Sequence, residues 1–161
     1  KEETAGRHGD IAICQSDIDN LLRSKAAVYA AATVLMEEMG MTWEDVKTIY
    51  IAGAFGNYLD IEKSIFIGLL PDLPLTKFHS IGNSSISGAK SAMLSATALA
   101  KAEDVARKMT YIELSVGDTF FQQFVAATFL PHTDANLFPS VLEKLSSFDD
   151  SKHDSAYTKL T

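Results

Sequence analysis

The sequence predicts the α/β fold class, a sheet flanked by helices, on two observations. Short segments rich in β-forming residues alternate along the chain with longer segments whose apolar residues recur about every 3.6 positions. One short segment, residues 48–52, is largely apolar on both faces, which is typical of a strand buried between layers of helices. This alternation of strands and helices predicts a sheet with some parallel pairing.

A short strand at residues 11–14 and a long helix ending near Met39 are the first predicted elements. Ser16 is followed three residues later by Asp19, a pattern similar to the capping box that starts helices. Gly40 is placed to end the helix. The apolar stripe of this helix consists of Ile18, Leu21, Leu22, Val28, Tyr29, Ala32, Leu35, Met36 and Met39.

Two strand–turn–helix units of similar layout follow. The strand at 48–52 ends in a glycine-containing turn, after which Asp60 is placed to cap a helix that extends to about Ile67. A second strand at 78–81 leads through another glycine-containing turn into a helix. The other predicted elements are a helical turn at 42–45, helices at 86–96, 97–108 and 118–129, and a strand at 111–114.

The composition divides the chain into three regions. Residues 1–10 are polar and read as a disordered or linker start, residues 11–134 form the domain, and residues 135–161 form a C-terminal tail. Within that tail, residues 136–145 could form a short helix begun at Pro139, and residues 146–161 are polar and expected to fray. At 161 residues the chain is long enough for one domain, or one lobe of a larger one.

Charge and targeting features argue against several classes of function. With 14 basic and 21 acidic residues the net charge is −7, so the sequence has no basic face for nucleic acid or for an anionic membrane surface. No apolar run is long enough to span a membrane, and the start of the chain lacks the apolar core of a signal peptide. We therefore expect a cytoplasmic protein. The chain also lacks an initiator Met, as an excised fragment would.

A single cysteine, Cys14, limits the redox and metal chemistry of the chain. It excludes an internal disulfide, a cysteine-rich zinc site and an iron–sulfur cluster held by four thiolates of this chain. Its apolar surroundings favour a small buried side chain over a nucleophile. The four histidines have no ligand spacing, and the sequence shows no catalytic constellation, so we assign neither metal nor catalytic residues; His132 is expected to be a turn residue.

The two glycine-containing turns are the strongest candidates for a ligand site. Ligands of α/β proteins bind beyond the carboxyl ends of strands, where glycine lets a ligand approach the backbone and helix amides favour phosphate or sugar oxygens. Two neighbouring strand ends of this kind would form one cleft floor. The alternative is that both are tight connections with Asp60 and Ser84 or Ser85 as plain caps, since neither turn matches a Walker A loop or a dinucleotide fingerprint. The candidate residues are Gly53, Ala54, Phe55, Gly56 and Asn57 of the first turn, and Gly82, Asn83, Ser84 and Ser85 of the second.

Lys25 lies on the edge of the apolar stripe of the long helix. It is either a lysine whose stem packs on the apolar face while its ammonium reaches water, or a cation directed at a ligand in the cleft.

Five segments, in order, together resemble the C-terminal domain of the reductive activators of corrinoid proteins. The resemblance covers residues 11–134. The segments are DIDNLLRSKAAVY at 17–29, YIAGAFGNYLDIEK at 50–63, IGLLPD at 67–72, IGNSS at 81–85 and MTYIELS at 109–115. It implies an ASKHA-type lobe, that is, one lobe of the actin/sugar-kinase/heat-shock-chaperone (ribonuclease H-like) fold, with a mixed sheet flanked by helices.

The resemblance also implies a function and cofactors. Family members reduce an inactive Co(II) corrinoid to Co(I), use ATP with Mg²⁺ to drive the electron transfer, and carry a [2Fe–2S] cluster in an N-terminal ferredoxin-like domain. The turn at Gly53–Asn57 resembles the adenosine motif of the superfamily, with Ala54 where a second glycine is common, and by the same analogy Lys25 would lie near the nucleotide.

The phosphate-binding turns, the acidic residue that positions Mg²⁺ and the cluster cysteines of that family have no counterpart in this sequence. We therefore expect this chain alone to bind adenine nucleotide weakly and not to hydrolyse ATP. Expected partners are a corrinoid protein, an upstream ATPase lobe and a ferredoxin-like domain of the same chain. The sequence leaves open whether the protein forms a homodimer.

Two further hypotheses compete with the activator. One is a docking or dimerisation module without nucleotide, using the aromatic segment at 120–124; the other is a lobe of a small-molecule kinase.

Overall fold

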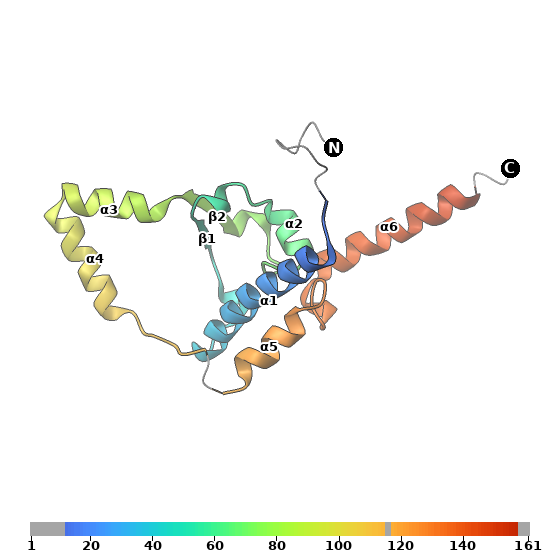
Figure 1. Cartoon of the computed structure of the whole chain (residues 1–161), viewed down its shortest axis with the longest axis horizontal. Coiled ribbons are helices and arrows are strands. Elements are labelled where there is room, and N and C mark those ends of the chain that lie inside the picture. The colour runs from blue at the N-terminus through green and yellow to red at the C-terminus, as the bar shows by residue number, and fades with distance from the viewer. Residues whose placement is uncertain (1–11, 115–116, 158–161) are drawn as a thin grey trace.

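The computed structural model describes residues 12–114 and 117–157, and its elements alternate as the α/β class requires. Helices flank a small sheet, and helices both precede and follow the strands along the chain (Figure 1). Short 3₁₀ turns lie between several of these elements. The helices are α1 (Gln15–Glu38), α2 (Ile61–Phe66), α3 (Ser84–Leu94), α4 (Ala96–Lys108), α5 (Thr119–Ala127) and α6 (Pro139–Tyr157); the strands are β1 (Ile49–Ala52) and β2 (Phe78–Gly82). The 3₁₀ turns are η2 (Trp43–Asp45), η3 (Phe55–Asn57), η4 (Leu75–Lys77) and η5 (Ala135–Leu137).

The sheet consists of β1 and β2, which pair in parallel from Ile49 opposite Phe78 to Ala52 opposite Gly82, with a register shift before Ala52. The predicted α/β class and both of these strands are confirmed, but β1 is not buried on both faces as expected, because its residues alternate between half-buried and exposed and Tyr50 is 66% exposed. The strands predicted at 11–14 and 111–114 are wrong in the described residues, since 12–14 and 111–114 are irregular and Ile11 lies outside them. A strand needs a neighbouring edge for its backbone hydrogen bonds, and among the described residues neither segment has one.

The N-cap of α1 lies two residues earlier than the predicted cap, Ser16. Cys14 is the N-cap, and its backbone N–H donates to the Asp17 carboxylate at 2.9 Å, so the reciprocal cap is made by this pair and not by Ser16 and Asp19. This position also leaves the Cys14 side chain exposed, which corrects the expectation of a buried thiol.

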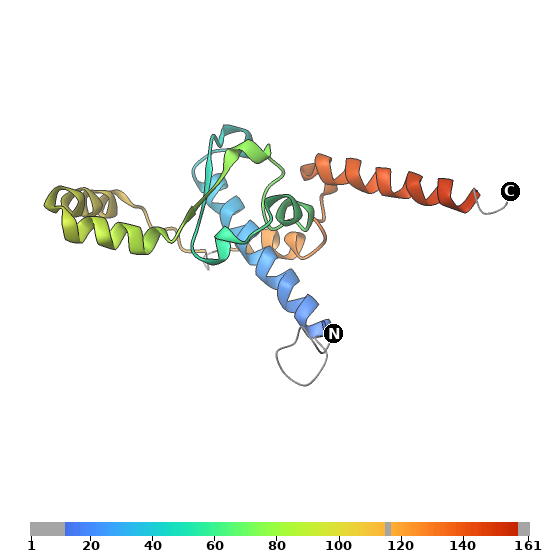
Figure 2. The same ribbon diagram turned by 90° about the horizontal axis from the view of Figure 1, so that it is seen from above.

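The core forms where α1 packs along α5, with β1, β2, α2 and the start of α6 around them (Figures 1 and 2). Phe138 and Val141 belong to it at 0% and 2% exposure, although both lie in the predicted C-terminal tail. The predicted short helix does begin at Pro139, but it continues to Tyr157 and so includes most of the segment expected to fray. The buried cluster comprises Ala26, Tyr29, Ile65, Phe78, Ala127, Phe138 and Val141.

The connection from α5 to α6, residues 128–138, is held against α2 by a very close backbone approach. Gly68 ends α2 with φ of +75°, and a Cβ built there would lie 2.0 Å from the carbonyl oxygen of Pro131. Farther along, the Asp72 carboxylate accepts hydrogen bonds from the Ser140 backbone N–H at 2.8 Å and from its hydroxyl at 2.7 Å. These contacts fix the first turn of α6 over the core.

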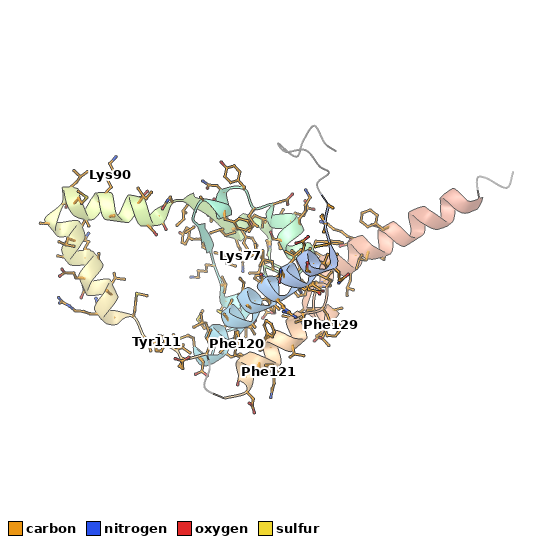
Figure 3. All side chains as sticks on the ribbon, viewed as in Figure 1. Lys77, Lys90, Tyr111, Phe120, Phe121 and Phe129 are labelled. Atoms are coloured by element: carbon orange, nitrogen blue, oxygen red, sulfur yellow. The ribbon has the colours of Figure 1, made fainter. Side chains whose placement is uncertain are left out.

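Helices α3 and α4 form a hairpin that projects away from this core (Figures 1 and 2). Neither helix has a buried residue, and they pack on each other. The break between them is at Ser95, whose hydroxyl accepts from the Ala98 N–H at 3.3 Å, close to the predicted boundary. Figure 3 shows Lys90 on this hairpin, far from the core.

Candidate functional site

The two glycine-containing turns lie side by side at the carboxyl edge of the sheet. Because β1 and β2 are parallel and Ala52 pairs with Gly82, both turns leave the same edge. The Gly53 N–H donates to the Gly82 carbonyl at 2.7 Å, and the Ser80 hydroxyl donates to the Asn57 side-chain oxygen at 2.7 Å. The sequence placed these turns on adjacent strand ends, and the structure confirms that arrangement.

The surface in front of Gly53 is open. Gly53 has φ of +98°, and a Cβ built there would have no heavy atom within 4 Å outside its chain neighbours. Gly82 has φ of +65°, and a Cβ built there would lie 3.7 Å from the side-chain nitrogen of Asn57. Ala54, Phe55 and Asn57 are exposed, with Phe55 at 79%. A ligand can therefore reach the backbone of the first turn at Gly53 without displacing a side chain, whereas the Asn57 side chain lies next to Gly82.

Gly56 differs from the other turn residues because it is buried. A Cβ there would lie 2.6 Å from Ile51 Cγ2, so the absence of a side chain lets η3 pack against β1. The structure thus places four residues of the first turn at the surface or edge and Gly56 against the strand.

The second turn leads directly into the N-terminus of α3. Asn83 is its N-cap and accepts from the Ile86 N–H at 3.1 Å, so the cap is Asn83 and neither Ser84 nor Ser85. Ser85 is exposed in the first helical turn, where backbone N–H groups are free of intrahelical partners. Asp60 caps α2 as predicted, accepting from the Lys63 N–H at 3.0 Å; bonds from Lys63 lower the pKa of the Asp60 carboxyl.

Lys25 is placed differently from both sequence interpretations. Its side chain is 0% exposed, so its ammonium does not reach water. The ammonium donates to the carbonyls of Phe129 and of Pro131, the latter at 2.7 Å, and so joins α1 to the α5–α6 connection. We therefore leave Lys25 out of the nucleotide site and assign it a role in holding this connection.

Burial lowers the pKa of Lys25 from 10.5 to about 8, which predicts an unusual pH dependence of stability. Between pH 8 and 9.5 the unfolded chain holds more of this proton than the folded chain, so the free energy of unfolding rises with pH. The slope is a fraction of the one-proton limit of about 1.4 kcal/mol per pH unit. Chemical denaturation at several pH values measures it, and Lys25→Met should remove the rise. An equal rise in Lys25→Met would contradict this assignment.

Tyr29 does not contribute to this pH range, because burial raises its pKa to about 12.

His132, which the sequence predicts to be a turn residue, lies in the irregular α5–α6 connection and is buried. It is 8% exposed, its Nδ1 accepts from the Asp134 N–H at 3.0 Å, and its ring lies 5.5 Å from that of Tyr29. Burial lowers its pKa, which keeps the imidazole neutral beside the Lys25 ammonium. Nothing in the local sequence pattern shows this burial, since it depends on the packing of α1 against a segment over 100 residues away.

The family model for the C-terminal domain of RACo, the ASKHA domain, matches residues 1–142. The chain belongs to this ASKHA domain family. The predicted family is thereby confirmed, and the match reaches beyond residue 134 to include Phe138 and Val141 of the core. Gly68, Asp72 and Lys25 all lie in segments that carry the family resemblance, and each of them contacts a residue between 129 and 140.

The chain is also similar to curated proteins and to a solved structure. The chain is 37% identical over 119 residues to the corrinoid activation enzyme RamQ of Eubacterium limosum, covering 74% of this chain and 20% of the relative. It is 29% identical over 112 residues to the [Co(II) methylated amine-specific corrinoid protein] reductase of Methanosarcina barkeri, covering 68% and 21%.

A solved structure, the reductive activator for corrinoid, iron–sulfur protein, superimposes with a TM-score of 0.79 at 50% identity, covering 83% of this chain and 21% of that one. The chain thus spans about a fifth of the length of each relative.

Within residues 12–114 and 117–157, no group of three or more His, Cys, Asp or Glu side chains is arranged to hold a metal ion. In the same described part of the chain, no helix combines the length and apolarity needed to cross a membrane.

Proposed function

We propose that this chain is the nucleotide-binding lobe of an ATP-dependent activator that reduces Co(II) corrinoid proteins to Co(I). The main support for this proposal is that the two glycine-containing turns lie at one edge of the sheet, where a hydrogen bond joins Gly53 to Gly82. The chain is also a member of the ASKHA domain family. The names of the relatives support a role in corrinoid activation.

Both turns fit an adenine nucleotide. The open space before Gly53 and the exposed residues Ala54, Phe55 and Asn57 would bind the base and ribose, and Ser84 and Ser85 would bind polar sugar or phosphate atoms. When bound, Mg²⁺-ATP supplies the free energy of phosphoanhydride hydrolysis. The residues of this chain bind and orient the nucleotide, and we assign the catalytic groups to the rest of the full-length protein.

The [2Fe–2S] cluster does not fit this chain. The sequence has one cysteine, Cys14, and its exposed thiol is hydrogen-bonded to Asp17 at 2.9 Å. We therefore place the cluster in another domain of the full-length protein.

One face of the sheet is exposed, and this exposure supports the inference that a companion lobe of the full-length protein covers it. Parallel sheets are normally covered on both faces, and a two-stranded sheet is not stable by itself. Here Ile49, Ile51 and Phe78 pack on the core, whereas Tyr50 and Ile81 are 66% and 47% exposed. We infer that the remainder of the polypeptide covers the exposed face.

Titration with ATP and ADP in the presence of Mg²⁺, followed by thermal shift, tests this site. We expect saturable stabilisation that Gly53→Val weakens at least tenfold, because a branched side chain would fill the open space before the turn. Valine at φ of +98° is also strained, at a cost of about 1–2 kcal/mol.

Gly117→Val is the matched control for this strain. Gly117 has φ of +84° and equally open space, but lies outside both turns. It should lose a similar amount of stability and bind nucleotide unchanged. If folded Gly53→Val binds as well as the starting chain, the site is elsewhere. If this chain does not bind nucleotide, the same two variants are compared in the full-length protein. If Gly53→Val does not weaken nucleotide binding there either, the proposed nucleotide site is wrong.

A docking module remains the second candidate, because the outer side of α5 is apolar and exposed. Residues 119–130 carry no charge, and Phe121 and Phe129 are 66% and 58% exposed (Figure 3). Phe124 instead packs against the core, with the Phe120 ring 6.2 Å away. Loss of nucleotide binding in every form of the protein would favour this candidate.

A further inference from the structure

A side-chain hydrogen bond joins β2 to the first glycine-containing turn. The hydroxyl of Ser80, in β2, donates to the side-chain oxygen of Asn57, in η3, at 2.7 Å. The other acceptor within reach of this hydroxyl, the Gly56 carbonyl, is farther away at 3.4 Å. A serine hydroxyl has one proton to donate, so the contact with Asn57 is the stronger of the two.

The backbone that carries Asn57 is also held against the sheet. The preceding residue, Gly56, is buried, and a Cβ there would lie 2.6 Å from Ile51 Cγ2. Ile51 is the residue of β1 that pairs with Ser80 of β2. The turn η3 is therefore anchored at two neighbouring points of the sheet, by its packing on Ile51 and by the hydroxyl of Ser80.

This arrangement fixes which end of the Asn57 carboxamide is available to a ligand. The oxygen is used by Ser80, whereas no described residue accepts a hydrogen bond from the side-chain nitrogen. That nitrogen would lie 3.7 Å from a Cβ built on Gly82, and Asn57 as a whole is exposed. The side chain therefore presents two N–H donors beside the second turn, while its oxygen is already occupied.

A fixed donor favours binding in two ways. An asparagine without a partner would change rotamer freely and would turn either its oxygen or its nitrogen toward a ligand. Because Ser80 selects one orientation before the ligand arrives, less conformational freedom is lost on binding. The orientation also selects ligands that offer a hydrogen-bond acceptor at this point over ligands that offer a donor.

We propose that Ser80 is a positioning residue of the nucleotide site, which holds the Asn57 carboxamide so that its N–H groups meet a hydrogen-bond acceptor of the bound nucleotide. This inference rests on the proposed nucleotide site. The acceptor belongs either to the nucleoside or to the phosphate chain, since both parts of a nucleotide carry acceptor atoms. Ser80 acts through Asn57 and needs no contact with the nucleotide.

A double-mutant cycle on nucleotide affinity tests this inference, in whichever form of the protein binds Mg²⁺-ATP in the titration above. Asn57→Ala removes the donors and should raise the Kd for ATP about tenfold. Ser80→Ala leaves the donors but frees their orientation, and should raise the Kd about threefold. Because Ser80 acts through Asn57, Ser80→Ala should add nothing to the loss in Asn57→Ala. Ser80→Thr keeps the hydroxyl and should restore the original Kd.

Ser91→Ala is the matched control for loss of an exposed serine hydroxyl. The Ser91 hydroxyl donates to the Ser87 carbonyl at 2.9 Å within α3, outside both turns, and its removal should leave the Kd unchanged. Adenosine is titrated beside ATP to locate the acceptor. A loss of affinity in Asn57→Ala for both compounds places the acceptor in the nucleoside, and a loss for ATP alone places it in the phosphate chain.

The outcomes separate this inference from the nucleotide site on which it rests. Each variant is first shown to unfold cooperatively. If Gly53→Val weakens ATP binding and Asn57→Ala does not, the site stands and the inference is overturned. If Ser80→Ala costs as much in Asn57→Ala as it does alone, Ser80 does not act through Asn57, and the positioning role is wrong. If no form of the protein binds nucleotide, the site and the inference fall together.

Discussion

Replacing Gly68 with alanine is expected to abolish or nearly abolish folding. The new Cβ would lie 2.0 Å from the Pro131 carbonyl oxygen, far inside contact distance, and Gly68 also has φ of +75°. Pro131 cannot easily withdraw, because its carbonyl also accepts a hydrogen bond from the buried Lys25. We expect the free energy of unfolding to fall by about 4 kcal/mol or more, a large share of the roughly 5–15 kcal/mol typical of a domain.

Gly40→Ala separates the steric clash from backbone strain. Gly40 has a similar φ of +62°, but its Cβ would meet nothing within 4 Å. It should cost only about 1–2 kcal/mol. Denaturation with urea measures both variants, and equal losses would show that the approach of Pro131 contributes little.

Ending the chain after Asp134 is expected to have the second large effect. This truncation removes Phe138 and Val141 from the core, as well as the bonds from Ser140 to Asp72. Loss of a buried Phe costs about 3–5 kcal/mol and loss of a buried Val adds to it, so we expect no cooperative thermal transition.

Ending the chain after Phe148 provides the comparison. It keeps every buried contact of α6 described above, including the pair between Lys144 and Glu62. Its melting temperature should stay within a few degrees of the full chain. If both truncations melt alike by circular dichroism, residues 135–148 do not contribute to the core.

Local signals in the sequence were sufficient for most helices and for the candidate turns. Periodicity located α1 and α5, Asp60 capped α2 as expected, and apolar strands followed by glycine identified β1 and β2. The two turns could be placed together because adjacent parallel strands present their carboxyl ends at one edge.

Features that depend on distant contacts could not be predicted in this way. The burial of Lys25 and His132 arises from α1 packing against a segment more than 100 residues later. The segment predicted as a strand at 111–114 does not pair with either strand of the β1–β2 sheet. Phe138 was assigned to the C-terminal tail because the family resemblance ended at residue 134, although Leu137 and Val141 near it are apolar. In each case local propensity gave way to tertiary context.

The link between Lys25 and Phe129 also has a consequence for synthesis of the protein, since 104 positions separate the two residues. At about 5–20 residues per second, a ribosome needs roughly 5–20 s to add that length. During this interval the apolar face of α1 has been made, but its partner α5 has not. The apolar face of α1 therefore stays uncovered on the nascent chain during this interval, and the core can close only after Val141 has been added.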